Sequence, residues 1–242
     1  MSWTTNLFLR LSPLILPYLV LFCGGVFLTV CQSIGVLTPL PQDGGALDAY
    51  AGLLTDRSFF ASFAFSLGVA AVSALFAVAI GTFLAYRVWQ LPGRLATAAL
   101  VYKIPLILPH IAVAFVVLVF WSQSGILAST AHSLGLIQSM NEFPNVLYSG
   151  WGIGMILAYT LKGTPFAMLL VLALLVRFDV RQIQTAAMLG ASGLRIFSSI
   201  VLPRLAPAIH TGFIILLLYG FGAFDIPYLL SESRPGMLSI HV

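Results

Sequence analysis

Residues 60–86 read FASFAFSLGVAAVSALFAVAIGTFLAY and contain no charged side chain. An α-helix of about 20 predominantly apolar residues is long enough to cross the hydrocarbon core of a bilayer. A helix also satisfies its own backbone hydrogen bonds there, where no water is present to do so. The segment is therefore predicted to be a membrane-spanning helix.

The composition of the whole chain agrees with this prediction. Hydrophobic residues make up 60% of the 242 residues, and charged residues only 7%. A soluble domain carries about 25% charged residues and could not cover its surface with so few. Disorder is excluded because it requires low hydrophobicity. The net charge of +4 does not indicate nucleic acid binding, because the basic residues are scattered singly between apolar segments.

Four further segments are long and apolar enough to span the membrane. The five predicted spans are 13–37, 60–86, 104–121, 150–176 and 208–230. They predict an all-α, polytopic membrane protein.

The distribution of basic residues predicts the orientation, because cytoplasmic loops carry an excess of Lys and Arg. Eight basic residues fall on one side of the spans and two, Arg57 and Arg234, on the other. The amino terminus and two basic loops are therefore predicted to be cytoplasmic, and the loops at about 38–59 and 122–149 to face outward. The eight are Arg10, Arg87, Arg94, Lys103, Arg177, Arg181, Arg195 and Arg204.

The cytoplasmic loop at 177–207 has the pattern of two short helices. Asp179 is a predicted N-cap for the first helix, and Gly190 is suited to end it in a left-handed conformation. Ser192 is a predicted N-cap for the second, and Pro203 and Pro207 predict a break or bend before the last span. Such a loop forms either a compact projection or an amphipathic connector lying on the lipid surface, and the pattern alone leaves both open.

The same loop resembles a known signature. The loop contains the spaced pattern Gln184-Thr185-Ala186, three residues, Gly190, nine residues, Ile200, one residue and Leu202-Pro203. This pattern is similar to the EAA loop of ABC importer permeases. Gln184 and Thr185 depart from the Glu and the first Ala of that pattern, so a hydrogen bond would replace a salt bridge to an ATPase. The resemblance extends from about residue 59 to the end and is to permeases of the polyamine, ferric-iron, thiamine and sulfate type.

The resemblance implies a type I ABC importer transmembrane domain with the coupling loop at 177–207. Two copies of a cytoplasmic ATPase, a second permease subunit and a periplasmic solute-binding protein would be its partners in the cell inner membrane, and ATP hydrolysis would occur in the ATPase. The expected coupling residues are Gln184, Thr185, Ala186, Met188, Leu189, Gly190, Ala191, Ser192, Ile200, Leu202 and Pro203.

The resemblance also implies a domain organisation. Residues 1–58 would be an N-terminal transmembrane helix with an outer loop, and residues 59–242 the permease core. Such cores usually have a sixth span, whereas this sequence ends shortly after the fifth. We therefore expect five spans, with an outward-facing carboxyl terminus and the sixth span absent from the sequence.

Two ionisable residues are predicted to lie at membrane depth. Lys162 is followed by Gly163 and Pro165, and Asp225 precedes Pro227. Intramembrane charges usually face a cavity or a partner, and broken helices are common at transport sites. Lys162, Pro165, Asp225 and Pro227 are accordingly expected to line or gate the solute path, the two charges as a pair. The alternative is that each charge has only a structural role.

Two other classes of function, an intramembrane enzyme and a channel or secondary carrier, fit the sequence less well. An intramembrane enzyme would need a nucleophile with a base, or metal ligands, and the sequence contains neither a His-Glu-x-x-His nor a Gly-x-Ser-x-Gly motif. A channel or secondary carrier would not explain the patterned cytoplasmic loop. The sequence also has no Walker A motif, so no catalytic residue, cofactor or metal site is predicted for this chain.

Overall fold

The computed structural model describes residues 2–36, 48–92, 104–231 and 236–240. Within these ranges the chain forms helices and their connections, with no strand. Arg94, Lys103 and Arg234, which contributed to the orientation count, lie outside the described residues, as do parts of the outer loop and of the carboxyl-terminal segment.

The chain divides into two compact units, Met1–Phe59 and Phe60–Val242. The first unit contains α1 (Ser2–Ser33) and α2 (Asp48–Thr55). The helix α2 lies within the segment 38–59 that the sequence analysis predicted as an outward-facing loop. Asp56, just after α2, accepts hydrogen bonds from the backbone N–H and the hydroxyl of Ser58.

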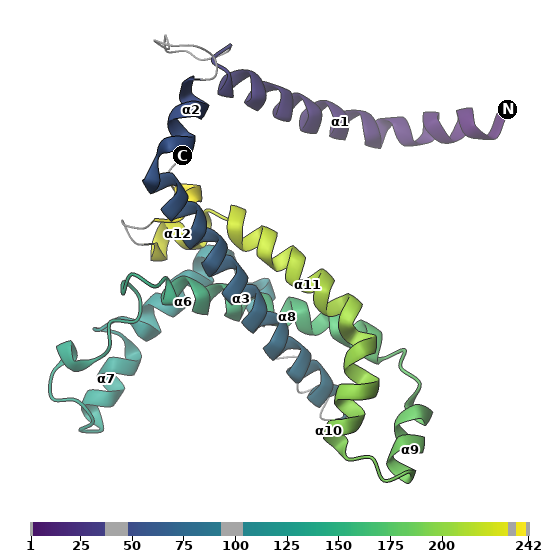
Figure 1. Cartoon of the computed structure of the whole chain (residues 1–242), viewed down its shortest axis with the longest axis vertical. Coiled ribbons are helices and arrows are strands. Elements are labelled where there is room, and N and C mark those ends of the chain that lie inside the picture. Colours follow the sequence, from purple (N-terminus) through teal and green to yellow (C-terminus); the bar gives the residue numbers. More distant parts are fainter. Residues whose placement is uncertain (1, 37–47, 93–103, 232–235, 241–242) are drawn as a thin grey trace. The chain divides into compact units, whose positions relative to one another are not determined.

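The second unit contains the remaining helices (Figure 1). The long ones are α3 (Arg57–Trp89), which begins at the boundary, α8 (Ile153–Leu175) and α11 (Leu202–Gly222). The shorter elements are α5 (Ile104–Ile107), α6 (His110–Trp121), α7 (Ile126–Ser133), η2 (Met140–Glu142), α9 (Val180–Met188), α10 (Gly193–Ile196), η3 (Phe197–Val201), α12 (Asp225–Leu230) and η4 (Leu238–Ile240).

The described residues contain five helical segments long and apolar enough to cross a membrane, as predicted from the sequence. They are Leu11–Ser33, Arg57–Trp89, His110–Ser133, Ile153–Leu175 and Gly193–Gly222. The fold is thus an all-α, polytopic membrane protein.

The predicted bounds of the third span are wrong. Residues 104–121 do not form one helix, because Pro109 interrupts it and serves as the N-cap residue of α6. Proline has no N–H to donate to a carbonyl one turn earlier, so the short helix α5 ends before it.

The predicted bounds of the fifth span are wrong at both ends. α10 continues through the π-helical turn η3 into α11, so Pro203 and Pro207 do not break the chain. Pro203 lies in the first turn of α11, where a missing N–H is tolerated. At the other end the helix stops at Gly222, and α12 begins at Asp225 with Pro227 in its first turn.

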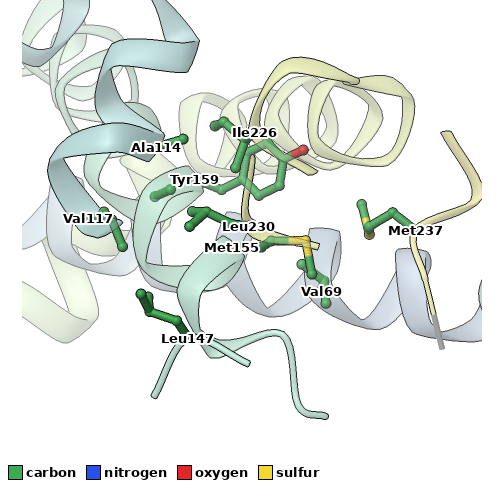
Figure 2. Packing of buried hydrophobic residues seen from close by; sticks show 10 residues of the cluster. Val69, Ala114, Val117, Leu147, Met155, Tyr159, Ile226, Leu230 and Met237 are labelled. Atoms are coloured by element: carbon green, nitrogen blue, oxygen red, sulfur yellow. The ribbon is translucent and has the colours of Figure 1, made fainter. Parts of the chain in front are cut away.

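Two groups of buried residues hold the second unit together. In the first, which we name the α12 cluster, α12 packs against α3, α6 and α8 (Figure 2). Met237 is fully buried in it, and the backbone N–H of Leu238 donates to the hydroxyl of Ser66 on α3. The members of the α12 cluster are Val69, Ala114, Val117, Leu147, Met155, Ala158, Tyr159, Ile226, Leu230 and Met237.

The second group, which we name the elbow cluster, joins α3 and α8 to the segment from α10 to α11. Its members are Ala85, Met168, Val171, Leu175, Ile196, Val201 and Leu205. Between the two clusters, α3 and α8 approach closely at small residues. A Cβ built on Gly81 would lie 2.8 Å from the Cβ of Ala167, and one on Gly163 would lie 3.0 Å from the Cβ of Ala77. Small residues allow such close backbone approach inside membranes.

Candidate functional site

The loop between α8 and α11 forms a helical elbow, residues 179–196, with the caps that the sequence predicted. Asp179 accepts a hydrogen bond from the N–H of Arg181 at 3.0 Å and begins α9. Ser192 accepts one from the N–H of Arg195 at 3.4 Å and begins α10. Gly190 between them has φ +83°, in the left-handed region where a side chain is strained. The elbow lies at one end of α8 and α11 (Figure 1).

One side of α9 faces the elbow cluster. Ile183 and Ala186 are half-buried and pack against this cluster, as does Ala191 in the turn. Ile200, which lies in η3, packs against the same cluster. Three residues of the 184–203 segment, Ala186, Ala191 and Ile200, therefore anchor the elbow to this cluster.

The opposite side of the elbow exposes large apolar side chains. Met188 is 82% exposed, Leu189 is 83% exposed and Leu194 is 79% exposed. Gln184 and Thr185 are exposed as well, and the hydroxyl of Thr185 donates to the carbonyl of Arg181 within α9. Leu202 and Pro203 lie further along, at the start of α11, and both are exposed.

Lys162 lies in the middle of α8, which is continuous from Ile153 to Leu175 through Pro165. The expected local break of this helix is therefore wrong. The ammonium group of Lys162 donates to the carbonyls of Pro105 at 2.7 Å, Leu106 at 3.1 Å and Leu108 at 2.5 Å. These three acceptors were not predicted from the sequence, although the spacing of Pro105 and Pro109 was a signal for a helix interruption.

Asp225 begins α12 and is exposed, whereas Pro227 is fully buried two residues later. The expected break next to Asp225 is found, since the backbone of Ala223 is extended. The carboxylate of Asp225 and the ammonium of Lys162, both among the described residues, do not form an ion pair. The pairing of these two charges on a solute path stays a prediction.

A cavity of about 230 Å³ lies beside Lys162 between α3, α6, α8 and α11. His110 and Tyr219, whose rings are 5.0 Å apart, contribute to its lining, as does Tyr159. Tyr159 is 5% exposed, and its hydroxyl has no hydrogen-bond partner in the structure. A separate apolar cavity of about 710 Å³ is lined by residues that include Pro105, Pro165 and Thr164. Of the four residues expected on a solute path, Lys162 and Pro165 thus line cavities.

The fold and the elbow define a class: a multi-pass helical membrane protein with a capped helical projection between two of its spans. Comparison with known proteins identifies the family. Residues 77–240 match the model of the binding-protein-dependent transport system inner membrane component. The chain belongs to this family.

Two curated relatives from Escherichia coli (strain K12) are transport permeases. The molybdenum transport system permease protein ModB is 26% identical over 186 residues, which cover 76% of this chain and 76% of ModB. The thiamine transport system permease protein ThiP is 28% identical over 222 residues, which cover 89% of this chain and 39% of ThiP.

Two solved structures share the fold. One is a bacterial ABC transporter involved in the import of the acidic polysaccharide alginate, with a TM-score of 0.76 and 18% identity over 98% of this chain and 82% of that chain. The other is a bacterial alginate ABC transporter in complex with alginate pentasaccharide-bound periplasmic protein, with a TM-score of 0.77 and 19% identity over 99% of this chain and 84% of that one.

These findings agree with the resemblance in the 184–203 pattern. The chain is a membrane-spanning permease subunit of an ABC importer. Its family is one of membrane components rather than of catalytic subunits.

Proposed function

We propose that the elbow is the coupling element on which a separate cytoplasmic ATPase docks. The observation that carries the proposal is the two-sided character of α9. Ile183 and Ala186 attach one side to the spans, while Met188 and Leu189 leave an apolar surface on the other. Burying a Leu or Met side chain contributes about 1.5–3 kcal/mol, so this surface suits a protein partner.

The coupling residues in this proposal have two roles. Ala186, Ala191 and Ile200 attach the elbow to the elbow cluster, and Gly190 and Ser192 set its turn. Gln184, Thr185, Met188 and Leu189 form the surface for the ATPase, and Leu202 and Pro203 begin the span that carries the motion onward. ATP hydrolysis takes place in the ATPase, of which two copies serve the transporter.

The remaining parts of the transporter complete the proposal. A second permease subunit, identical or paralogous, pairs with this chain, and a periplasmic binding protein delivers a small hydrophilic solute to the outer side. The amino terminus is cytoplasmic, in accordance with the distribution of basic residues. Residues 1–58 form an accessory helix with an outer loop, and residues 59–242 form the core. The two compact units, which meet between Phe59 and Phe60, support this division.

The solute path in this proposal runs beside the cavity that Lys162 lines. Pro165, three residues further along α8, lines the separate apolar cavity, and Asp225 with Pro227 marks the start of α12 after the break that ends α11. Helix breaks of this kind are used at transport sites because they expose backbone groups to the path. If α12 acts as a gate, its movement would change the backbone between Gly222 and Asp225, where α11 ends and α12 begins.

The test is co-purification of the ATPase with the tagged full-length chain from native membranes. Leu189→Asp places a charge on the docking surface and should reduce the recovered ATPase by about tenfold, which corresponds to roughly 1.4 kcal/mol. Leu136→Asp is the matched control, since Leu136 is also highly exposed, at 74%, but lies outside the elbow. Equal recovery of ATPase with both variants would contradict the docking proposal.

A further inference from the structure

The contacts of Lys162 differ from those of a charge exposed to a solute. Lys162 is half-buried, and its ammonium group has three N–H donors. The structure gives it three acceptors, the carbonyls of Pro105, Leu106 and Leu108. No donor of this group remains free for a transported molecule.

The sequence explains why these carbonyls need a donor. In an uninterrupted helix the carbonyl of Pro105 would accept from the N–H of residue 109, but Pro109 has none. The carbonyl of Leu108 would accept from the N–H of Ala112, which instead donates to the carbonyl of Pro109 at 3.0 Å. Unsatisfied carbonyls are costly in the hydrocarbon region of a membrane. Lys162 therefore replaces the hydrogen bonds that Pro109 removes.

The short helix α5 forms part of the wall of the 230 Å³ cavity beside Lys162. Leu106 from α5 and Lys162 from α8 both line it, next to His110 from the start of α6. The ammonium group thus attaches α5 and the residues just before Pro109 to α8 at the cavity wall. Loss of this attachment would release the wall while leaving the rest of α8 in place.

We propose that Lys162 is a positioning residue that caps the end of α5 and fixes the interrupted segment 104–110 as one wall of the cavity. The importance of that wall for transport rests on the proposed function, in which the cavity adjoins the solute path. The capping role itself is independent of which solute or ATPase the transporter uses. Lys162 acts on the path through α5 and does not bind the solute with its charge.

Hydrogen–deuterium exchange of the full-length chain in lipid nanodiscs measures the capping role. In Lys162→Met, exchange of the amides in peptides covering residues 104–113 should rise by about tenfold, because three charge-assisted hydrogen bonds are lost. Peptides from the carboxyl-terminal half of α8 should be unchanged. Lys162→Arg, which keeps the charge and several donors, should restore most of the protection.

Thr164→Val is the matched control on the same helix. Thr164 lies half a turn from Lys162, but its hydroxyl donates to the carbonyl of Thr160 within α8. This variant should leave exchange at residues 104–113 unchanged. The rate of thiol labelling at Leu106→Cys gives a second readout of the cavity wall, and this rate should rise when Lys162→Met is added. The background for this experiment has the free cysteines Cys23 and Cys31 replaced by Ser.

The decisive variant combines Lys162→Met with Pro109→Ala. Alanine supplies the N–H that the carbonyl of Pro105 lacks, so the double variant should lose clearly less protection than Lys162→Met alone. Should Lys162→Met fail to yield folded protein, recovery of monodisperse protein from the double variant would support the proposal. Exchange in the double variant as fast as in Lys162→Met alone, or no change in Lys162→Met, would overturn it. Since these readouts need neither ATPase nor solute, this outcome is separate from that of the docking test.

Discussion

Replacing Gly81 by Ala should destabilise the protein through the contact between α3 and α8. A Cβ at this position would lie 2.8 Å from the Cβ of Ala167, 2.8 Å from the carbonyl oxygen of Thr164 and 2.9 Å from the backbone N of Met168. Ordinary contacts begin at 3.4 Å, so the helices would have to separate by roughly half an ångström. Two of the three neighbours are backbone atoms, which cannot rotate away.

The magnitude follows from two opposing effects. Inserting a methyl group into a packed interface costs about 1–3 kcal/mol, while Ala favours a helix over Gly by about 1 kcal/mol. The net loss in the free energy of unfolding should be about 0–2 kcal/mol relative to the unmodified chain, and about 1–3 kcal/mol relative to a Gly→Ala substitution that meets no neighbour. For a chain of this size, 1 kcal/mol lowers the melting temperature by about 2–4 °C.

Thermal unfolding of the purified full-length chain in detergent, followed by size-exclusion chromatography, measures this loss. Gly68→Ala is the matched control, since Gly68 lies on the same helix and its added Cβ would meet nothing within 4 Å. The control should be as stable as the unmodified chain or slightly more stable. If Gly81→Ala melted at the same temperature as Gly68→Ala, the reasoning from backbone proximity would be refuted.

Three further predictions concern the elbow and the first unit. Gly190→Ala, at φ +83°, should destabilise the elbow by about 1–2 kcal/mol and reduce the ATPase that co-purifies. Ala186→Leu should reduce it too because Ala186 packs on the elbow cluster, whereas Leu at the exposed neighbour Ala187 should not; equal losses would count against this geometry. The two hydrogen bonds from Ser58 lower the pKa of Asp56, so the stabilisation of this turn is present above about pH 4 and is lost as the pH falls through the lowered pKa. Ser58→Ala should raise that pKa toward 3.8, measurable by carboxyl NMR titration.

The sequence predicted the number of spans and the caps of the elbow because both depend on local chemistry. An uncharged segment such as 60–86 has no stable alternative to a spanning helix. Asp179, Gly190 and Ser192 act on the turn of helix next to them, so their positions along the chain indicate their roles directly.

The ends of the third and fifth spans were mispredicted because the effect of a proline depends on distant partners. Pro109 ends a helix, and the freed carbonyls are satisfied by Lys162, more than 50 residues away in the sequence. Pro203 does not end one, because it lies in the first turn of α11, directly after the π-helical turn. The acceptors of Lys162 could not be predicted for a related reason: a sequence does not give the rotation of one helix relative to another.

The arrangement of the two clusters suggests how a movement of the elbow would reach the far end of the core. Ile183 and Ala186 pack against a cluster whose members include residues of α3, α8 and α11, so a displacement of α9 acts on a cluster that three spans share. Packed interiors transmit displacement because they contain little free volume. Along α11 the continuous backbone then leads to the break after Gly222, where α12 begins and inserts Ile226 and Leu230 into the α12 cluster. The helical hydrogen bonding of α11 is interrupted at the π-helical turn η3 before it, at Pro207 in its interior and at the extended residue Ala223 after it. Bending of α11 would be concentrated at these points, and the cavity lined by Tyr219 lies between Pro207 and the break after Gly222.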